Sequence, residues 1–142
     1  MKLYIAGASA EIERCEAFRD AAVALGYEIT ADWMAMIQLC DGAANHGLSP
    51  EARHAARSLA VYGIHQCDLF VLLMPRPPAT TIGAWYEWNR AESAGKRCLI
   101  VGVDAERTVM TAGCDVIESD ADALEWMRGR LANGGGYDPE RP

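Results

Sequence analysis

The segment Asp68–Met74 carries the strongest apolar run in the sequence, and it constrains the fold more than any other feature. Its apolar residues follow one another without polar alternation, which is typical of a strand buried on both faces. Pro75, Pro77 and Pro78 end the run, because proline interrupts the hydrogen-bond ladder of a sheet. A strand with two buried faces needs helices on both sides of its sheet, so this segment favours an α/β fold.

Shorter strand-like runs alternate with helical periodicities along the rest of the chain. Parallel neighbours need a crossover connection, and such crossovers are right-handed. We therefore predict a doubly wound, flavodoxin-like or Rossmann-like domain over residues 1–132, with helices on both faces of a five-stranded parallel sheet in the order 2-1-3-4-5. Residues 133–142 contain three consecutive glycines and are expected to form a loosely ordered tail. The expected strands lie near residues 3–6, 27–30, 69–74, 97–102 and 116–117, and the expected helices near 12–25, 50–66, 82–94 and 122–131.

In a sheet of this order the ligand crevice lies beyond the carboxyl ends of the strands, where the order reverses between the first and third strands. Two loops meet there, residues 7–10 after the first strand and residues 75–83 after the third. Thr80 or Thr81 can cap the helix that follows. The free N–H groups of its first turn, with Gly83 allowing close approach, suit a sugar hydroxyl or a phosphate. Helix capping alone explains the threonines equally well.

Glu87 is the carboxylate most relevant to chemistry at this crevice. It lies four residues after Gly83, and Ala91 and Ala94 continue the same helical face, so its side chain is expected on a stripe of small residues against the sheet. An unpaired carboxylate is costly to bury, whereas one at the rim of a crevice can act as a nucleophile or base. The alternative is an ordinary solvated glutamate.

Two tryptophans of the same predicted helix, Trp85 and Trp88, fall off the small-residue stripe. On a lone monomer they are expected to be exposed, and exposed aromatic side chains of this size are typical of a contact with another subunit. We therefore expect a homodimer or a higher homo-oligomer.

The charge balance argues against several classes of partner. Thirteen Lys and Arg residues against twenty Asp and Glu residues give a formal net charge of −7, and the basic residues are scattered, so a nucleic-acid polymer is not an expected partner. No apolar run approaches the roughly 20 residues that span a bilayer, and no signal peptide is evident, so we expect a cytoplasmic protein without a membrane partner. The five cysteines form no C-x-x-C pair and the histidines lack metal-ligand spacing, so neither a disulfide framework, a metal ion nor a cofactor is expected.

A set of short motifs is spread over residues 2–102. They are Leu3–Gly7, Gly26–Thr30, Asp32-Trp33, Cys67-Asp68, Thr81-x-Gly83-x-x-x-Glu87, Ala91, Gly95-Lys96 and Val101-Gly102. No single motif is specific, because small-residue turns and helical glutamates occur widely. Taken together, their order and spacing resemble the nucleoside 2-deoxyribosyltransferase family, which includes the 2'-deoxynucleoside 5'-monophosphate N-glycosidases.

This resemblance implies a doubly wound α/β fold and cleavage or transfer of the N-glycosidic bond of a small molecule, a 2'-deoxynucleoside or its 5'-monophosphate. In the family a glutamate attacks the anomeric carbon of the 2-deoxyribose, the base leaves, and water or a second base resolves the glycosyl-enzyme ester. Glu87 matches this nucleophile, and Thr81, with Gly83 beside it, matches the position that binds the 5' end of the sugar. The other expected partners of Glu87 in the crevice are Gly7, Ser9 and Trp33.

The chain also departs from the family pattern. The family commonly has an aspartate eight residues before the position of Asp68, where it assists the leaving base, and this sequence has Ala60 there. Asp32 would compensate by protonating the base while the Trp33 indole stacks on it. An equally good interpretation is that Trp33 covers the core and Asp32 is a turn residue.

The first loop, residues 7–10, also lacks the arginine with which the nucleotide-hydrolysing members of the family hold a 5'-phosphate. Arg14 and Arg76 are candidates to replace it. Two alternative functions stay open, a catalytically silent nucleoside- or nucleotide-binding module of the same fold and a phosphoribohydrolase-like enzyme. The second is the weaker, because residues 80–83 do not supply the glycine run that precedes the glutamate in those enzymes.

Overall fold

The computed structural model describes residues 1–39, 48–77, 79, 81–103 and 114–133. Its sheet has five strands in the order β2-β1-β3-β4-β5, and every neighbouring pair is parallel. The predicted strand order and parallel sense are therefore confirmed. The strands are β1 (Lys2–Ala6), β2 (Glu28–Ile29), β3 (Leu69–Leu73), β4 (Arg97–Val101) and β5 (Asp115–Ile117).

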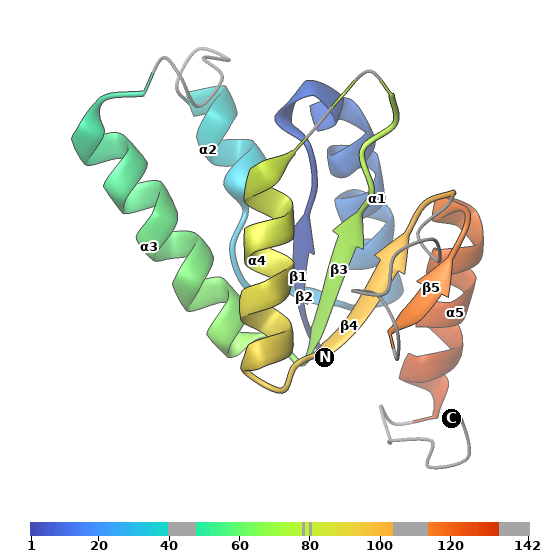
Figure 1. The fold of residues 1–142 in the computed structure, drawn as a ribbon. Helices are drawn as coiled ribbons and strands as arrows, with labels where there is room; N and C mark the ends of the chain where they lie inside the picture. Colours follow the sequence, from blue (N-terminus) through green and yellow to red (C-terminus); the bar gives the residue numbers. More distant parts are fainter. Residues whose placement is uncertain (40–47, 78, 80, 104–113, 134–142) are drawn as a thin grey trace.

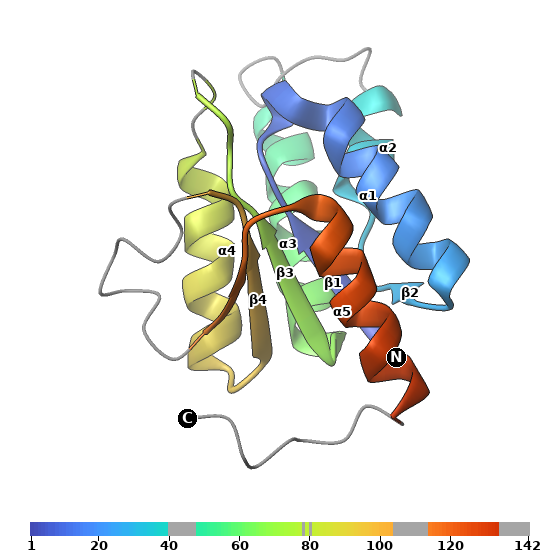
Figure 2. The same ribbon diagram turned by 90° about the vertical axis from the view of Figure 1, so that its right-hand side faces the viewer.

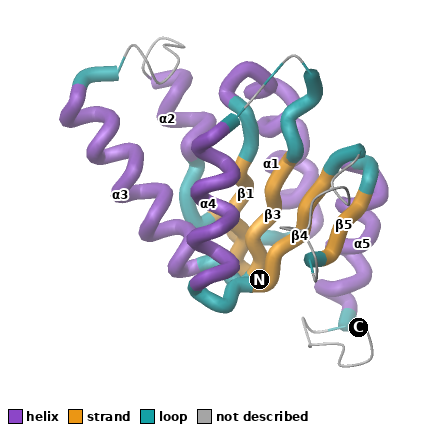
Figure 3. Tube along the Cα trace, in the orientation of Figure 1, coloured by secondary structure: helices purple, strands orange, loops and turns teal. Residues whose placement is uncertain are grey.

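Helices cover both faces of this sheet, as the apolar run of β3 requires (Figure 1, Figure 2). On β1, Leu3 and Ile5 pack into the core beneath α1 and α5, whereas Tyr4 and Ala6 pack into the core beneath α3 and α4. Figure 3 shows the strands lying between the two helical layers. The helices are α1 (Ile12–Leu25), α2 (Trp33–Leu39), α3 (Pro50–Gln66), α4 (Ile82–Ser93) and α5 (Asp120–Ala132), and a short 3-10 turn, η1 (Ser9–Glu11), precedes α1.

Local signals set the ends of several helices. The Ser49 hydroxyl accepts a hydrogen bond from the backbone N–H of Ala52 at 3.2 Å, and Pro50 occupies the first helical position of α3. Gly26, which ends α1, has a φ of 105°, a left-handed conformation that glycine adopts at little cost. These boundaries follow the sequence prediction because capping depends on neighbouring residues only.

Helix α2 was not predicted. From the sequence, Asp32 and Trp33 are expected beside the crevice, or as a turn residue and a core cover, with no element expected over 34–39, whereas the structure forms a helix over Trp33–Leu39. The Asp32 carboxylate accepts the backbone N–H of Ala35 at 3.0 Å and so starts the helix. The predicted loop at 41–49 and the predicted tail lie largely outside the described residues, at 40–47 and 134–142.

The expectation that Trp85 and Trp88 are exposed is wrong. Trp88 is 2 % exposed and packs between the helix and the sheet, and Trp85 is partly buried with its ring 5.7 Å from that of Trp88 in an edge-to-face contact. The buried face of α4 runs through Ala84, Trp88 and Ala91, one residue further round the helix than predicted. Because neither tryptophan is exposed, Trp85 and Trp88 give no support to a homo-oligomer.

The four cysteines in the described residues are free, and Cys15, Cys67 and Cys98 are buried. Burial raises the pKa of the Cys15 and Cys67 thiols to about 11. Such thiols stay protonated near neutral pH and act as small apolar residues of the core. In the described part of the chain, no helix has both the length and the apolar character needed to cross a membrane.

Candidate active site

A cavity of about 580 Å³ opens at the carboxyl ends of β1 and β3, between α2, α3 and the start of α4. This is the point at which the strand order reverses, where ligands of open α/β sheets bind. Residues from five separate segments meet around it. The lining residues are Gly7, Ser9, Trp33, Met36, Ile37, Leu48, Arg53, Ala56, Arg57, Ala60, Val61, Ile64, Thr81, Ile82, Gly83, Ala84, Tyr86, Glu87 and Arg90.

The structure brings six of the seven predicted site residues together in this cavity, although it does not test their roles. They are Gly7, Ser9, Trp33, Thr81, Gly83 and Glu87. Asp32 is the exception. Its carboxylate accepts the N–H of Ala35 and pairs with Arg19 at 2.9 Å, outside the lining.

Glu87 lies in the first half of α4 and lines the cavity. Burial raises the pKa of its carboxyl to about 7, and the Tyr4 hydroxyl lowers the pKa by a smaller amount. Near neutral pH the group is therefore present in both protonation states. The ionised form can attack an electrophilic carbon, and the protonated form can donate a proton.

Tyr4 is a core residue whose hydroxyl affects the acidity of Glu87. It is fully buried on β1, and its ring stacks on Phe70 of β3 with the centroids 5.5 Å apart. Burial first, and the nearby Glu87 carboxylate second, raise the pKa of the Tyr4 phenol well above its ordinary value. The phenol therefore stays protonated, and its buried hydroxyl makes no hydrogen bond with a described residue, so it keeps a free donor.

The helix that carries Glu87 begins at the predicted cap. The Thr81 hydroxyl accepts the N–H of Ala84 at 3.2 Å, so the capping interpretation of this threonine is confirmed. Gly83 is exposed, and a Cβ added there would meet only the Thr81 hydroxyl, at 4.0 Å. Packing does not require a glycine at this position, which leaves the backbone of the first turn open to a ligand.

The opposite wall is made by Gly7 and Trp33. A Cβ on Gly7 would lie 2.6 Å from the Cys15 sulfur, so the chain passes too close to α1 for a side chain. The Trp33 indole N–H donates to the carbonyl of Ile5 at 2.8 Å, which anchors the ring at the end of β1. The indole thus both covers the core and presents its ring to the cavity.

Sequence reasoning missed three arginines of the lining, Arg53 and Arg57 on α3 and Arg90 on α4. The signal was present, because an arginine pair four residues apart lies on one face of a helix. The two arginines proposed instead are engaged elsewhere. Arg14 donates to Asp120 at 2.7 Å and to the carbonyl of Met74 at 2.7 Å, and Arg76 pairs with the same Asp120 at 3.2 Å.

No metal-ligating group of three or more His, Cys, Asp or Glu side chains occurs among residues whose positions the structure gives. Glu87 is the one acid among the described lining residues. Ala60, where the family resemblance leads one to expect an aspartate, lines the cavity directly. The chemistry of the site therefore centres on one carboxyl group and several cationic side chains.

This arrangement defines a doubly wound α/β protein with its ligand cavity at the point of strand reversal. No family model and no curated protein matches the sequence. Among solved structures the fold is similar to that of a CMP N-glycosidase, BcmB, from Clostridium botulinum, with a TM-score of 0.59 and 17 % identity over 89 % of this chain and 98 % of that one. It is also similar to a conserved protein from Enterococcus faecalis V583, with a TM-score of 0.62 and 16 % identity over 92 % and 99 % of the two chains. At this identity the likeness shows the fold.

Proposed function

We propose that the chain is a divergent member of the nucleoside 2-deoxyribosyltransferase family and cleaves or transfers the N-glycosidic bond of a 2'-deoxynucleoside or its 5'-monophosphate. One observation carries the proposal most directly. A partly buried glutamate, Glu87, lines a cavity at the switch point of the sheet, together with four residues of the family motifs and with Ser9 of the first loop. The fold shared with a CMP N-glycosidase is consistent with this chemistry.

The reaction we propose begins with attack of the ionised Glu87 carboxylate on the anomeric carbon. The bond to the base breaks, its electron pair leaves with the base, and an ester forms between Glu87 and the deoxyribose. Water then attacks the same carbon, gives a proton to the medium and restores the carboxylate, whereas a second base in its place completes a transfer. The transition state has oxocarbenium character, so the nearby negative charge stabilises it.

Glu87→Gln is the test of this role. The substitution keeps the volume nearly unchanged and removes the charge, so base release should fall by several orders of magnitude while the fold survives. The assay incubates the protein with deoxynucleosides and their monophosphates, with and without a second free base, and follows base release by chromatography. A fluorinated deoxynucleoside should leave a deoxyribosyl adduct on the Glu87 peptide in mass spectrometry. Normal turnover by the variant, or an adduct elsewhere, would show that the mechanism is wrong.

A second candidate function is a catalytically silent nucleoside- or nucleotide-binding module. The observation that favours it is Ala60, because the described lining then offers no second acid to protonate the leaving base. Binding of several nucleotides without turnover of any would support the module. A phosphoribohydrolase-like activity is the third possibility, and release of base from ribonucleoside monophosphates alone would favour it.

We also keep a homo-oligomer and a cytoplasmic location as proposals. Large apolar side chains do remain exposed beside the cavity, with Ile82 90 % and Tyr86 55 % exposed on α4. Burial of this surface against a second copy would stabilise a dimer. Light scattering at micromolar concentration should then give a mass well above 15.4 kDa, and a monomer at every concentration would refute the oligomer.

A further inference from the structure

The arginines that line the cavity differ from the other arginines in the described part of the chain. Several of those lying outside the cavity pair with a carboxylate, whereas the structure gives Arg53, Arg57 and Arg90 no carboxylate partner among the described residues. An arginine without a local counter-charge is available to an external anion. The paired arginines and their partners are Arg14 with Asp120, Arg19 with Asp32, Arg76 with Asp120, Arg97 with Asp115 and Arg128 with Glu125.

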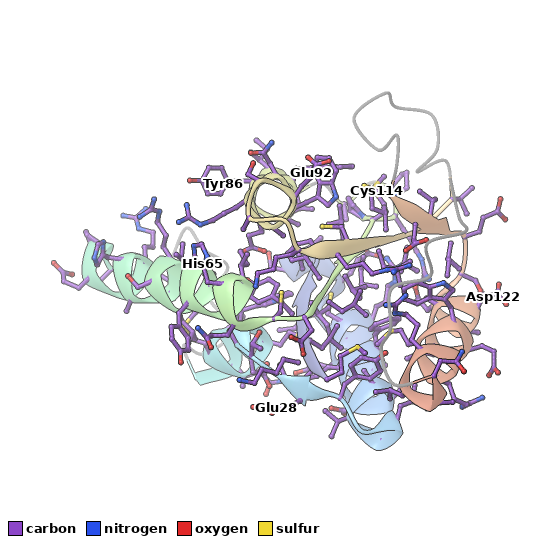
Figure 4. The ribbon with its side chains drawn as sticks, turned by 90° about the horizontal axis from the view of Figure 1, so that it is seen from below. Glu28, His65, Tyr86, Glu92, Cys114 and Asp122 are labelled. Carbon is purple, nitrogen blue, oxygen red and sulfur yellow. The ribbon has the colours of Figure 1, made fainter. Side chains whose placement is uncertain are left out.

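Two of the three cavity arginines converge on one side chain. Arg57 of α3 and Arg90 of α4 line the cavity together with Tyr86. The two arginines, Arg57 first, also lower the pKa of the Tyr86 phenol. Figure 4 shows Tyr86 projecting from α4 on the side away from the sheet. Tyr86 is an exposed residue of the cavity lining, so it lies where the cavity opens to solvent, and we call this place the mouth of the cavity. Cationic groups from both walls are therefore held close together.

Arg90 also carries an unsatisfied donor. Its Nε is buried and has no hydrogen-bond acceptor among the residues that the structure describes, while one Nη lies 3.4 Å from the His65 ring nitrogen. A buried guanidinium N–H without an acceptor is costly, and a ligand oxygen at this point would remove the cost. The feature is what a binding site shows before its ligand arrives.

We propose that Arg53, Arg57 and Arg90 form an anion subsite at the mouth of the cavity, and that the substrate carries a phosphate or carboxylate group that binds there. The anion subsite rests on the proposed function, which supplies the sugar and the base of the ligand, and it adds a charged group to that ligand. Guanidinium groups match both kinds of oxyanion because they donate two parallel hydrogen bonds. A positive mouth on a chain with a net charge of −7 also attracts anions selectively to this one place.

The subsite borders the reacting carboxylate, because Arg90 lies three residues after Glu87 on α4 and lines the same cavity. Burial and the Tyr4 hydroxyl account for the shifted pKa of Glu87, with no contribution from a cavity arginine. The guanidinium charges would offset the repulsion between an anionic group bound to them and the Glu87 carboxylate. The substrate would span the cavity, with its glycosidic carbon at Glu87 and its charged group at the mouth.

The test compares matched ligands on the full-length Glu87→Gln variant, which binds without turnover. Calorimetry would measure 2'-deoxynucleosides of the four common bases, the corresponding 5'-monophosphates, 5-carboxy-2'-deoxyuridine and inorganic phosphate. At least one anionic ligand should bind about tenfold or more tightly than its neutral counterpart, and added salt should reduce the difference. If the monophosphates bind more tightly than the neutral nucleosides, the subsite holds a phosphate. If 5-carboxy-2'-deoxyuridine binds more tightly, the subsite holds a carboxylate.

Arg57→Gln and Arg90→Gln should each abolish most of that difference, and the control Arg128→Gln on α5 should keep it. An anion that takes the arginine donors should also raise the pKa of Tyr86, which ultraviolet titration detects against a Tyr86→Phe background. Equal binding of neutral and anionic ligands, no measurable binding of any anion, or arginine variants with unchanged affinity would overturn the subsite. Since these readouts need no turnover, a missing cleavage activity would refute the proposed function while leaving the subsite in place.

Discussion

The buried hydroxyl of Tyr4 and the carboxyl of Glu87 lie close enough that each changes the acidity of the other. The Glu87 charge helps raise the pKa of Tyr4, and the Tyr4 hydroxyl keeps the pKa of Glu87 lower than burial alone would set it. The pair joins the first strand to the fourth helix, two segments far apart in the sequence. Its properties lead to the first two predictions.

Glu87→Gln should stabilise the fold at high pH. The folded-state pKa of about 7 lies above the ordinary value of 4.5, so the glutamate costs nothing at low pH and destabilises the fold increasingly as pH rises between the two values. The neutral glutamine avoids that cost. Urea unfolding should show the variant more stable by about 3 kcal/mol at about pH 8 and equal to the parent at about pH 4. Glu92→Gln, an exposed position on the same helix, is the control, and a pH-independent difference would contradict the buried carboxyl.

Tyr4→Phe should raise the pKa of Glu87 further while keeping the fold. The substitution removes the hydroxyl that lowers this pKa and leaves the ring stacked on Phe70. The rise of kcat/KM with pH, or the carboxyl resonance of Glu87 in NMR, should move to higher pH. Tyr62→Phe, at an exposed position, should leave the profile where it is. If Tyr4→Phe also leaves the pH profile unchanged, the Tyr4 hydroxyl does not lower the pKa of Glu87.

Asp120→Asn should destabilise the fold by about 1–3 kcal/mol at neutral pH, because Asp120 accepts charged hydrogen bonds from Arg14 at 2.9 and 2.7 Å. Burial opposes ionisation of Asp120, but the Arg14 hydrogen bond and the charges of Arg14 and Arg76 lower its pKa. Its contribution is therefore complete above the ordinary pKa of an aspartate and disappears as pH falls through the lowered value. Thermal unfolding across that range should show the two proteins converging in acid. Glu118→Gln, an exposed neighbour, should change little at any pH.

Gly63→Ala should destabilise the contact between α3 and the sheet. A Cβ there would lie 2.5 Å from the Cβ of Ala31 and 3.0 Å from the Tyr4 ring, so the helix would have to move outward. We expect a loss of about 1–3 kcal/mol in chemical unfolding. The matched control is Gly129→Ala on α5, where a Cβ meets nothing within 4 Å and helix propensity favours alanine by up to about 1 kcal/mol. Equal effects at the two positions would contradict the close packing at Gly63.

Much of the site could be predicted from the sequence because its parts are local. Three features depend only on residues near them in the sequence: the apolar run of β3, the Thr81 cap, and the glycines after β1 and at the start of α4. The parallel topology of the sheet then brings the strand ends together. Asp32 shows where this reasoning ends. Its position after β2 was predicted correctly, but whether its carboxylate faced a ligand depended on Arg19 and on a helix start that composition did not reveal.

The sequence by itself determined the strand order and the placing of Glu87 near the crevice, because alternation of apolar runs and crossover handedness leave few topologies open. Packing in three dimensions sets the rotation of α4, so that Ala84, Trp88 and Ala91 form its buried face and Glu87 lies at the edge of that face, in the cavity lining. It also decided that arginines of α3 and α4 meet at Tyr86. A helical period defines a face only to within about one residue, or 100°. The final rotation and the contacts between distant helices come from packing across the whole core.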